Sequence, residues 1–337
     1  MTQHGFIDNE ISVNANGGTE IAKRTLTALI DPELLKEFQI ISSRPRELDE
    51  DKIRILFAHD LATDPEVANL RDVNFRNKFH KLVFISNWQY QQYQLILGVP
   101  YSVGSAVIES GIHPIHIDFN EKKAQEEINM VYTSTPQRGL NILIPVFNKL
   151  CETHDNIRLH VFSSFKIYGW DDYDKQFEPL YDQCKENPKI TYHGFTPHDE
   201  LQEFLKKCHI FAYPCTWHET SCRAMIEAMS AGLLCVHPNY AGLYDTSGGL
   251  NMMYQGDVDG LTHANQFAGA LDTAINTIKT NPNINGRLVF NKNFVDARFN
   301  INSIKMQWEY MLKDLIRIYP TPEHRKFTKD MFVYKIS

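Results

Sequence analysis

The sequence lacks several features that would each indicate a class of function. No apolar run approaches the roughly 20 residues that span a bilayer, and the opening MTQHGFIDNEIS has neither the basic nor the apolar region of a secretory signal. The six cysteines form no C-x-x-C pair. The net charge is −7 and no basic tract occurs. We therefore expect a cytoplasmic protein without a transmembrane segment, with reduced thiols, no structural metal and no nucleic-acid partner.

Length and composition indicate two domains. The 337 residues exceed what one hydrophobic core usually holds, and 43% hydrophobic with 22% charged residues is ordinary for a globular protein. The polar segment 113–127 has few residues able to form a core, so we place the junction there. The prediction is a first domain over 1–125, expected on the side of the second substrate, a second over 126–300, expected to hold the main ligand, and a helical tail over 301–337. The amphipathic stretch in that tail either belongs to the second domain or crosses back to the first.

Short β-rich runs alternate with helix-periodic segments along the chain. This alternation predicts an α/β fold with two Rossmann-like, doubly wound parallel-sheet domains, whose ligand would bind in a crevice at the carboxyl ends of the strands. The strands expected in the first domain are 38–43, 53–59, 81–86 and 105–111, and those in the second are 129–134, 157–164, 189–195, 210–215, 233–238 and 250–255. The expected helices are 17–30, 87–97, 138–154, 197–208 and 222–232.

The segment TWHETSCRAMIEAMSAG combines a strand end, a polar loop and a helix. Glu219 lies in the loop, Thr220 and Ser221 are N-cap candidates, and the helix is expected from about Cys222. The free amides of a helix start and its dipole favour an anion such as a diphosphate. Glu219 and Glu227 lie too far apart for one acid–base pair and fit hydroxyls at opposite ends of a ligand. The alternative is that Glu227 is a helix-surface residue and that Glu219 is a first-turn acid, whose negative charge interacts favourably with the helix dipole.

With its flanking strands, this cassette resembles the Glu-x7-Glu signature of the retaining glycosyltransferases of family 4, which have the GT-B fold. Other segments are similar to the family in the same order: NANGGTEIAKRTLTAL, VFISNWQYQQY and VIESGI in the first half, and VYTSTPQRGLNILI and ITYHGFTPHDELQEFLKKCHIFAYP in the second. The resemblance extends from about residue 14 to 260 and is more specific in the second half.

The resemblance implies an enzyme that moves a hexose from a nucleotide-diphosphate sugar to an acceptor hydroxyl with retention of anomeric configuration. The donor would be a UDP-, GDP- or ADP-hexose, and the acceptor a glycan, a lipid-linked molecule or a small molecule. No cofactor and no metal are implied. Lipid-linked acceptors leave peripheral contact with a membrane open, although no basic amphipathic helix indicates it.

Three residues are implied in catalysis. Arg138 occupies the motif's basic position, where a guanidinium suits a diphosphate; the alternative is a solvated loop arginine. His59 ends a strand at the place where relatives carry a histidine that contacts the transferred sugar, or it caps that strand together with Asp60. Glu219 would contact the donor sugar or its phosphate.

The remaining implied contacts bind the donor. Glu227 would hold the ribose hydroxyls, and the loop 239–245 resembles one that closes over the nucleotide. The amides at two loops would approach the phosphates or the sugar. The positions at these loops are Gly17, Gly18, Thr220, Ser221 and Cys222. The Ser134 hydroxyl could also contact phosphate. Relatives carry a second basic residue where this chain has Thr133, Ser134 and Thr135, and Lys166 is a candidate replacement.

Two Asp-x-Asp pairs formally match manganese-dependent transferases, namely Asp257 with Asp259 and Asp172 with Asp174. We interpret both as solvated loops. Two alternative functions stay open at this point: a nucleotide-sugar-binding protein without transferase activity, and a nucleotide-sugar epimerase of the same fold. A Rossmann oxidoreductase is disfavoured because no G-x-G-x-x-G follows a strand.

Overall fold

The computed structural model describes residues 17–44, 47–119, 127–256, 260–326 and 332. It divides into two compact units, the first formed by 1–111 together with 301–337 and the second by 112–300. The sequence-based junction lies at 125. Residues just before it pack in the second unit, where the Ile112 amide donates to the Phe299 carbonyl and the Ile115 amide to the Ser230 hydroxyl.

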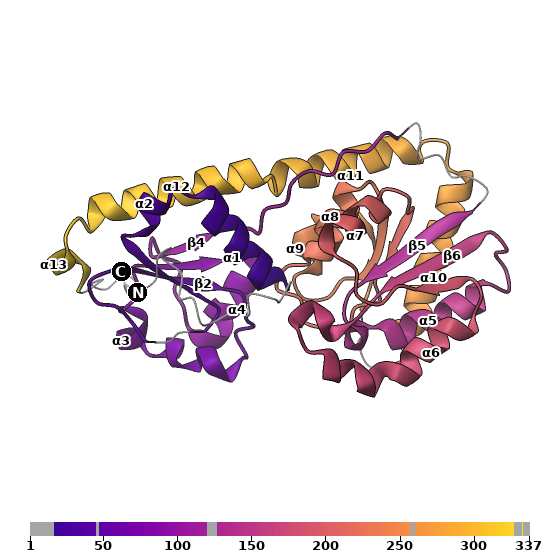
Figure 1. The fold of residues 1–337 in the computed structure, drawn as a ribbon, viewed down its shortest axis with the longest axis horizontal. Coiled ribbons are helices and arrows are strands. Elements are labelled where there is room, and N and C mark those ends of the chain that lie inside the picture. Colours follow the sequence, from indigo (N-terminus) through magenta and orange to yellow (C-terminus); the bar gives the residue numbers. More distant parts are fainter. Residues whose placement is uncertain (1–16, 45–46, 120–126, 257–259, 327–331, 333–337) are drawn as a thin grey trace. The chain divides into compact units, whose positions relative to one another are not determined.

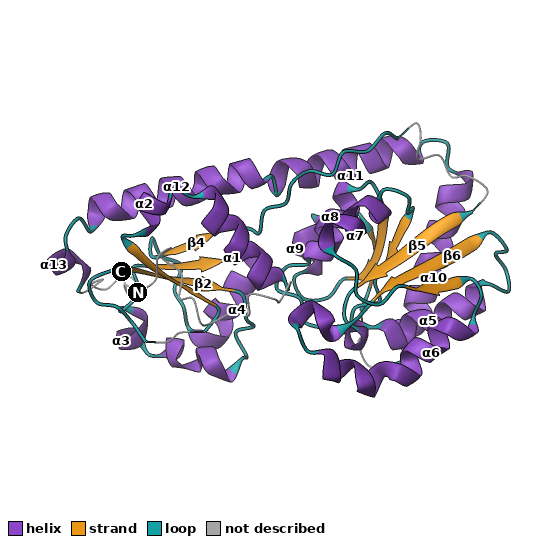
Figure 2. Cartoon of the chain, in the orientation of Figure 1, coloured by secondary structure: helices purple, strands orange, loops and turns teal. Residues whose placement is uncertain are grey.

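The first unit contains a four-stranded parallel sheet in the order β1-β2-β3-β4 (Figures 1 and 2). Its strands are β1 (Phe38–Ser42), β2 (Ile53–Ala58), β3 (Lys81–Phe84) and β4 (Ser105–Val107). Both β1 and β2 are buried along their whole length, as expected for a parallel sheet covered on two faces. The helices around it are α1 (Gly18–Leu29), α2 (Pro32–Leu35), α3 (Val73–Arg76) and α4 (Asn87–Leu97), with the 3-10 helix η1 (Pro65–Arg71).

Helix α12 (Ile301–Ile318) completes the core of the first unit. Its apolar stripe includes Ile304, Trp308 and Leu312, and the Trp308 ring packs edge-on against Phe57 of β2 at 5.0 Å between centroids. Helix α13 (Pro322–Arg325) follows, and the buried Arg325 guanidinium donates to the Glu37 carboxylate at 2.7 Å. The amphipathic tail therefore packs with the first unit, although it is separated from that unit's other elements by the whole second unit in sequence.

The second unit contains a six-stranded parallel sheet in the order β10-β9-β8-β5-β6-β7. Its strands are β5 (Ile128–Thr133), β6 (Ile157–Phe162), β7 (Ile190–Tyr192), β8 (Ile210–Ala212), β9 (Leu234–Pro238) and β10 (Met252–Tyr254). Its helices are α5 (Leu140–Leu150), α6 (Glu178–Glu186), α7 (His198–Leu205), α8 (Arg223–Ser230), α9 (Leu243–Ser247), α10 (Leu261–Thr280) and α11 (Ile284–Arg298). Three 3-10 helices complete it: η2 (Pro136–Arg138), η3 (Phe165–Tyr168) and η4 (Asp171–Phe177).

The prediction of an α/β protein with two parallel sheets is confirmed, and each of the ten expected strands is present. Nine of them are shorter than expected, and β5 has the expected length but begins and ends one residue earlier. Within the part of the chain that the structure describes, no helix is both long and apolar enough to cross a bilayer. The polar opening of the sequence and the pair Asp257 and Asp259 lie outside the described residues.

Candidate functional site

Two loops meet at the carboxyl ends of the adjacent strands β5 and β8. The loop after β5 runs through Ser134 to Gly139, and the loop after β8 runs from Pro214 to Cys222. Gly139 has φ +121°, and a Cβ there would lie 2.1 Å from the Pro214 carbonyl oxygen. Only glycine adopts this backbone conformation and permits this approach. Gly139 thus brings the basic loop directly against the loop that carries Glu219.

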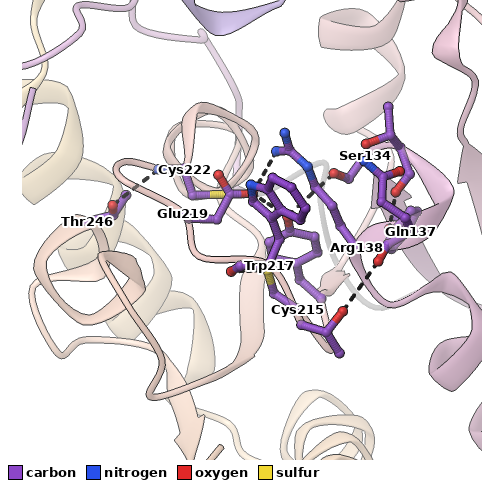
Figure 3. Close-up of polar contacts among 12 residues, drawn as sticks. Ser134, Gln137, Arg138, Cys215, Trp217, Glu219, Cys222 and Thr246 are labelled. Carbon is purple, nitrogen blue, oxygen red and sulfur yellow. Dashed lines mark hydrogen bonds and ion pairs between the residues drawn. The ribbon is translucent and has the colours of Figure 1, made fainter. Parts of the chain in front are cut away.

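Arg138 and Glu219 are the centre of a polar network at this junction (Figure 3). Arg138 Nη1 donates to Glu219 Oε1 at 2.8 Å, and the Tyr213 hydroxyl donates to the same oxygen at 2.6 Å. Arg138 Nη2 also reaches the Tyr168 hydroxyl at 3.3 Å, and the guanidinium lies 5.7 Å from the centroid of the Trp217 ring. We call these five residues the Arg138 cluster.

Glu219, at the centre of the Arg138 cluster, is 7% exposed and thus largely removed from water, whereas Trp217 at its edge is 45% exposed. Burial is the largest single influence and would lower the pKa of Arg138, but Glu219 together with Tyr168, Tyr213 and Cys215 outweighs it, and the pKa lies well above its usual value. Burial raises the pKa of Tyr213 well above its ordinary range, so its hydroxyl stays protonated and donates. Both hydrogen bonds end on Glu219 Oε1, and Oε2 has no partner among the described residues. This oxygen is free to accept a ligand hydroxyl.

The second glutamate, Glu227, lies inside α8 and is 4% exposed, so it is not a surface residue of the helix. Its Oε1 is contacted at 2.9 Å by Arg223 Nε and at 2.9 Å by His198 Nε2, from the first residue of α7. Burial would raise the pKa of Glu227, but these two neighbours outweigh it and lower the pKa below its usual value. Glu227 is therefore an ionised, fixed carboxylate.

The expected N-cap of α8 was wrong. The helix begins at Arg223, and its N-cap is Cys222 rather than Thr220 or Ser221. Cys222 has extended backbone angles, φ −104° and ψ 90°, so the helix cannot begin earlier. Its amide donates to the Thr246 hydroxyl of α9 at 3.3 Å, and no side chain caps the helix.

The loop 239–245 packs directly on the Glu219 loop. The Gly242 amide donates to the Glu219 carbonyl at 2.8 Å. A Cβ at Gly242 would lie 2.7 Å from that carbonyl oxygen and 2.6 Å from the carbonyl oxygen of Thr220. The Tyr240 hydroxyl also hydrogen-bonds His218 at 2.5 Å, and Ala241 between these residues has a left-handed φ of 48°. The segment that resembles a nucleotide-closing loop thus contacts the loop that carries Glu219.

The candidates in the first unit lie at the ends of its elements. Gly17 is the N-cap of α1, and a Cβ at Gly18 would meet open space, so neither backbone conformation requires glycine. His59 follows β2 and packs edge-on against Phe57 at 4.2 Å; its burial lowers its pKa to about 3, which keeps the ring neutral. The adjacent Asp60 carbonyl accepts bonds from the Gln89 and Tyr93 side chains.

Other candidates have structural partners. The Ser134 hydroxyl lies 3.4 Å from the Tyr213 hydroxyl and thereby borders the Arg138 cluster. Lys166 is exposed and lies 5.9 Å above the Phe195 ring. Asp174 is not a solvated loop residue, because it accepts bonds from the Ser164 hydroxyl, the Phe165 amide and the Tyr181 hydroxyl. Among the described residues, no group of three or more His, Cys, Asp or Glu side chains could hold a metal ion.

Sequence reasoning did not single out Tyr213, Tyr168, Trp217, His198 or Thr246. The only available signal was position, because Tyr213, Trp217 and His198 fall inside segments that carry the resemblance. Tyr168 and Thr246 reach the site through loop and helix packing, which no periodicity in the sequence indicates.

Comparisons with known proteins agree with this geometry. Residues 113–292 match the family model described as glycosyl transferases group 1. No protein in a search of curated sequences matches the chain. A glycosyltransferase from Rickettsia africae aligns with a TM-score of 0.65 at 14% identity, over 91% of this chain and 84% of that one.

Two further solved structures are similar. Sucrose-phosphate synthase from Thermosynechococcus elongatus aligns with a TM-score of 0.64 at 13% identity, over 83% of this chain and 74% of that one. HepE from Anabaena, solved in complex with UDP-glucose, aligns with a TM-score of 0.58 at 14% identity, over 88% and 82%. At these identities the likeness shows the fold alone, and it confirms the expected GT-B fold.

Proposed function

Because the chain belongs to the group 1 glycosyl transferases, we propose that it is a retaining, metal-independent enzyme that transfers a hexose from a nucleotide-diphosphate sugar to an acceptor hydroxyl. The observation that carries this proposal is the contact between Arg138 and Glu219, at the junction of two strand ends in the matched region. The segment resembles the Glu-x7-Glu cassette of family 4, whose first glutamate would correspond to Glu219. We propose the cytoplasm as the location.

Arg138 supplies the positive charge that a departing diphosphate needs. In the transition state negative charge builds on the leaving phosphate oxygens, and a fixed cation in a partly dry site stabilises it without reorganisation. Arg138 has more than one donor, so a phosphate oxygen can be bound while the contact with Glu219 keeps the guanidinium in place. Since this cation and the start of α8 can carry the leaving-group charge, the proposal needs no divalent ion.

Glu219 and Glu227 would hold the two ends of the donor. Oε2 of Glu219 is available to a hydroxyl of the hexose, because both of its bonds within the protein use Oε1. Glu227 would accept the ribose hydroxyls, and Arg223 and His198 fix its carboxylate for this task. In the first unit, Gly17, Gly18 and His59 remain proposed contacts of the phosphates and the transferred sugar.

We propose no covalent nucleophile. Arg138 and Tyr213 both bond Oε1 of Glu219, and these two contacts fix the position of its carboxylate. In the mechanism proposed here the departing phosphate oxygen takes the proton of the acceptor hydroxyl on the same face of the sugar, which retains the anomeric configuration.

The deciding experiment is a thermal-shift screen of the full chain against UDP-, GDP- and ADP-hexoses, followed by proton NMR of the product formed with a panel of acceptors. A bound donor increases the free energy of unfolding by RT ln(1 + [L]/Kd) and thereby raises the melting temperature. Transfer with retention supports the proposal. Release of free sugar and nucleotide without an acceptor would indicate the epimerase alternative, and binding without any turnover would indicate the binding protein. No stabilisation by any donor at millimolar concentration would refute a nucleotide-sugar site.

A further inference from the structure

Tyr213, a member of the Arg138 cluster, is held in a fixed position directly after β8. Its amide donates to the Val236 carbonyl of β9 at 2.9 Å, which continues the pairing of the two strands. Its ring is 1% exposed and packs against Phe211 and Tyr132, whose ring centroids lie 5.2 and 5.9 Å away. Because side chains in a close-packed interior are confined to few rotamers, the backbone and the ring together fix the place of the hydroxyl.

The Tyr213 hydroxyl lies in the middle of a chain of hydrogen bonds that ends on Glu219. It donates to Glu219 Oε1 at 2.6 Å, and the Ser134 hydroxyl lies 3.4 Å from it. Since a phenol has a single proton, Ser134 is the donor in this second contact. Tyr213 is therefore a neutral donor whose proton is directed at one acceptor.

Arg138, the other donor to Glu219 Oε1, has a second task in the proposed function. Its guanidinium would bind the departing diphosphate, whose oxygens compete with the carboxylate for the same protons. Tyr213 carries no charge, and its buried ring has no freedom to follow an anion. When a diphosphate is bound, Tyr213 is thus the contact that keeps Glu219 Oε1 in place.

A comparison with Tyr181 shows how Tyr213 differs from a structural tyrosine. The buried Tyr181 hydroxyl also donates to a carboxylate, that of Asp174, at 2.7 Å. Both oxygens of Asp174 are used within the protein, because a backbone amide donates to Oδ1 and a serine hydroxyl donates to Oδ2. In Glu219, by contrast, Oε2 has no partner among the described residues. A largely buried carboxylate with one uncommitted oxygen suits a ligand hydroxyl.

We propose that Tyr213 is a positioning residue for the donor sugar: it holds Oε1 of Glu219, so that Oε2 stays available to a hydroxyl of the hexose while Arg138 binds the diphosphate. This inference rests on the proposed function and adds the residue that keeps the sugar-binding carboxylate in place. The two donors to Oε1 have separate tasks, since Arg138 binds the phosphates and Tyr213 acts on the hexose through Glu219.

The test is a calorimetric titration of the full chain with whichever of the UDP-, GDP- and ADP-hexoses binds, and with the same nucleotide without its sugar. The ratio of the two Kd values isolates the contribution of the hexose. Tyr213→Phe keeps the packed ring and removes only the hydroxyl. We expect it to raise the Kd for the nucleotide-hexose by about tenfold, as for the loss of one hydrogen bond to a charged group, and to leave the Kd for the nucleotide unchanged.

Two further variants complete the experiment. Tyr181→Phe is the matched control, because it removes a buried hydroxyl from a carboxylate outside the Arg138 cluster, and it should change neither Kd. Glu219→Gln tests the route of the effect. If Tyr213 acts through Glu219, the double variant should bind the nucleotide-hexose no more weakly than Glu219→Gln alone.

The inference is overturned if Tyr213→Phe weakens both ligands equally, if it behaves like Tyr181→Phe, or if its effect adds to that of Glu219→Gln. Equal weakening of both ligands would mean that Tyr213 maintains the site as a whole. These outcomes leave the proposed function standing, because the parent protein still binds the donor. If the parent protein binds no nucleotide-hexose, the proposed function is refuted, and this inference is refuted with it.

Discussion

Arg138 and Glu219 form a hydrogen-bonded ion pair at 2.8 Å although 81 positions separate them in the sequence. The pairing of β5 with β8 brings them together, because parallel neighbours end at the same edge of the sheet. The pair is largely buried, so each side chain is the main counter-charge of the other.

Removing Arg138 should impair both chemistry and stability. In Arg138→Ala we expect kcat for sugar transfer to fall by about 10²- to 10³-fold, as for the loss of one transition-state donor. We also expect a lower free energy of unfolding, because Glu219 keeps only the Tyr213 hydroxyl as partner. Steady-state kinetics and urea unfolding measure the two effects.

A double-mutant cycle with Glu219→Ala provides the control for that prediction. Each single variant leaves one charge unpaired in a partly dry site, whereas the double variant leaves neither. The double variant should therefore lose less stability than the sum of the single losses. Additive losses would show that the pair contributes no coupling.

His198 should act through Glu227 on the donor. His198 Nε2 lies 2.9 Å from Glu227 Oε1, so His198→Ala removes one of the two contacts that fix this carboxylate and should raise the Kd for the nucleotide by about tenfold. With saturating donor, kcat should stay close to that of the unaltered protein. A His198→Gln variant, which keeps a donor, should recover part of the affinity. Equal Kd values for His198→Ala and the parent protein would contradict the role.

Gly139 and Gly242 should not tolerate alanine. In Gly139→Ala the positive φ alone costs about 1–3 kcal/mol, and the new Cβ also meets the Pro214 carbonyl at 2.1 Å. In Gly242→Ala the clash is with the carbonyls of Thr220 and Glu219. Gly286→Ala in α11 is the matched control, because its Cβ meets nothing within 4 Å, and it should stabilise the protein by about 0.5–1 kcal/mol. Thermal melts of the three variants decide the question.

Stability should fall as the pH drops below about 6.5. Burial lowers the pKa of His237 to about 4, so the unfolded chain binds a proton at this residue that the folded chain does not. By linkage, stability rises with pH between these two values, and this residue contributes up to about 2 kcal/mol between pH 5 and pH 6.5. Melting His237→Gln at several pH values should show a correspondingly flatter profile. A profile as steep as that of the parent protein would contradict this assignment.

The sequence predicted the sheets well because parallel strands buried on both faces are mostly apolar runs, such as IRILFA in β2 and LCVHP in β9, each interrupted by one polar or charged residue. It did not predict α6, α10 and α11, which were left unassigned between and after the recognised segments. The start of α8 was misplaced because Thr220 and Ser221 are favourable caps in composition, whereas the extended backbone at Cys222 is set by packing against Thr246.

For the site, the sequence supplied Arg138, Glu219 and Glu227 through the resemblance but not their partners. The bonds of Tyr213 and Tyr168 to this group depend on the direction of each side chain at a strand end or turn. Neither direction can be read from spacing. The same holds for His198, whose contact with Glu227 joins two helices that are adjacent only in space.

The discontinuous first unit has a consequence for the order of events during translation. Trp308 and its neighbours on α12 pack against the sheet of the first unit and complete its core, yet they are synthesised after the entire second unit. The amino-terminal part of the first unit therefore keeps an apolar face exposed until α12 has been synthesised, whereas the second unit can fold before that point. Chaperone engagement should accordingly be strongest before residue 301 emerges and should end once this helix docks.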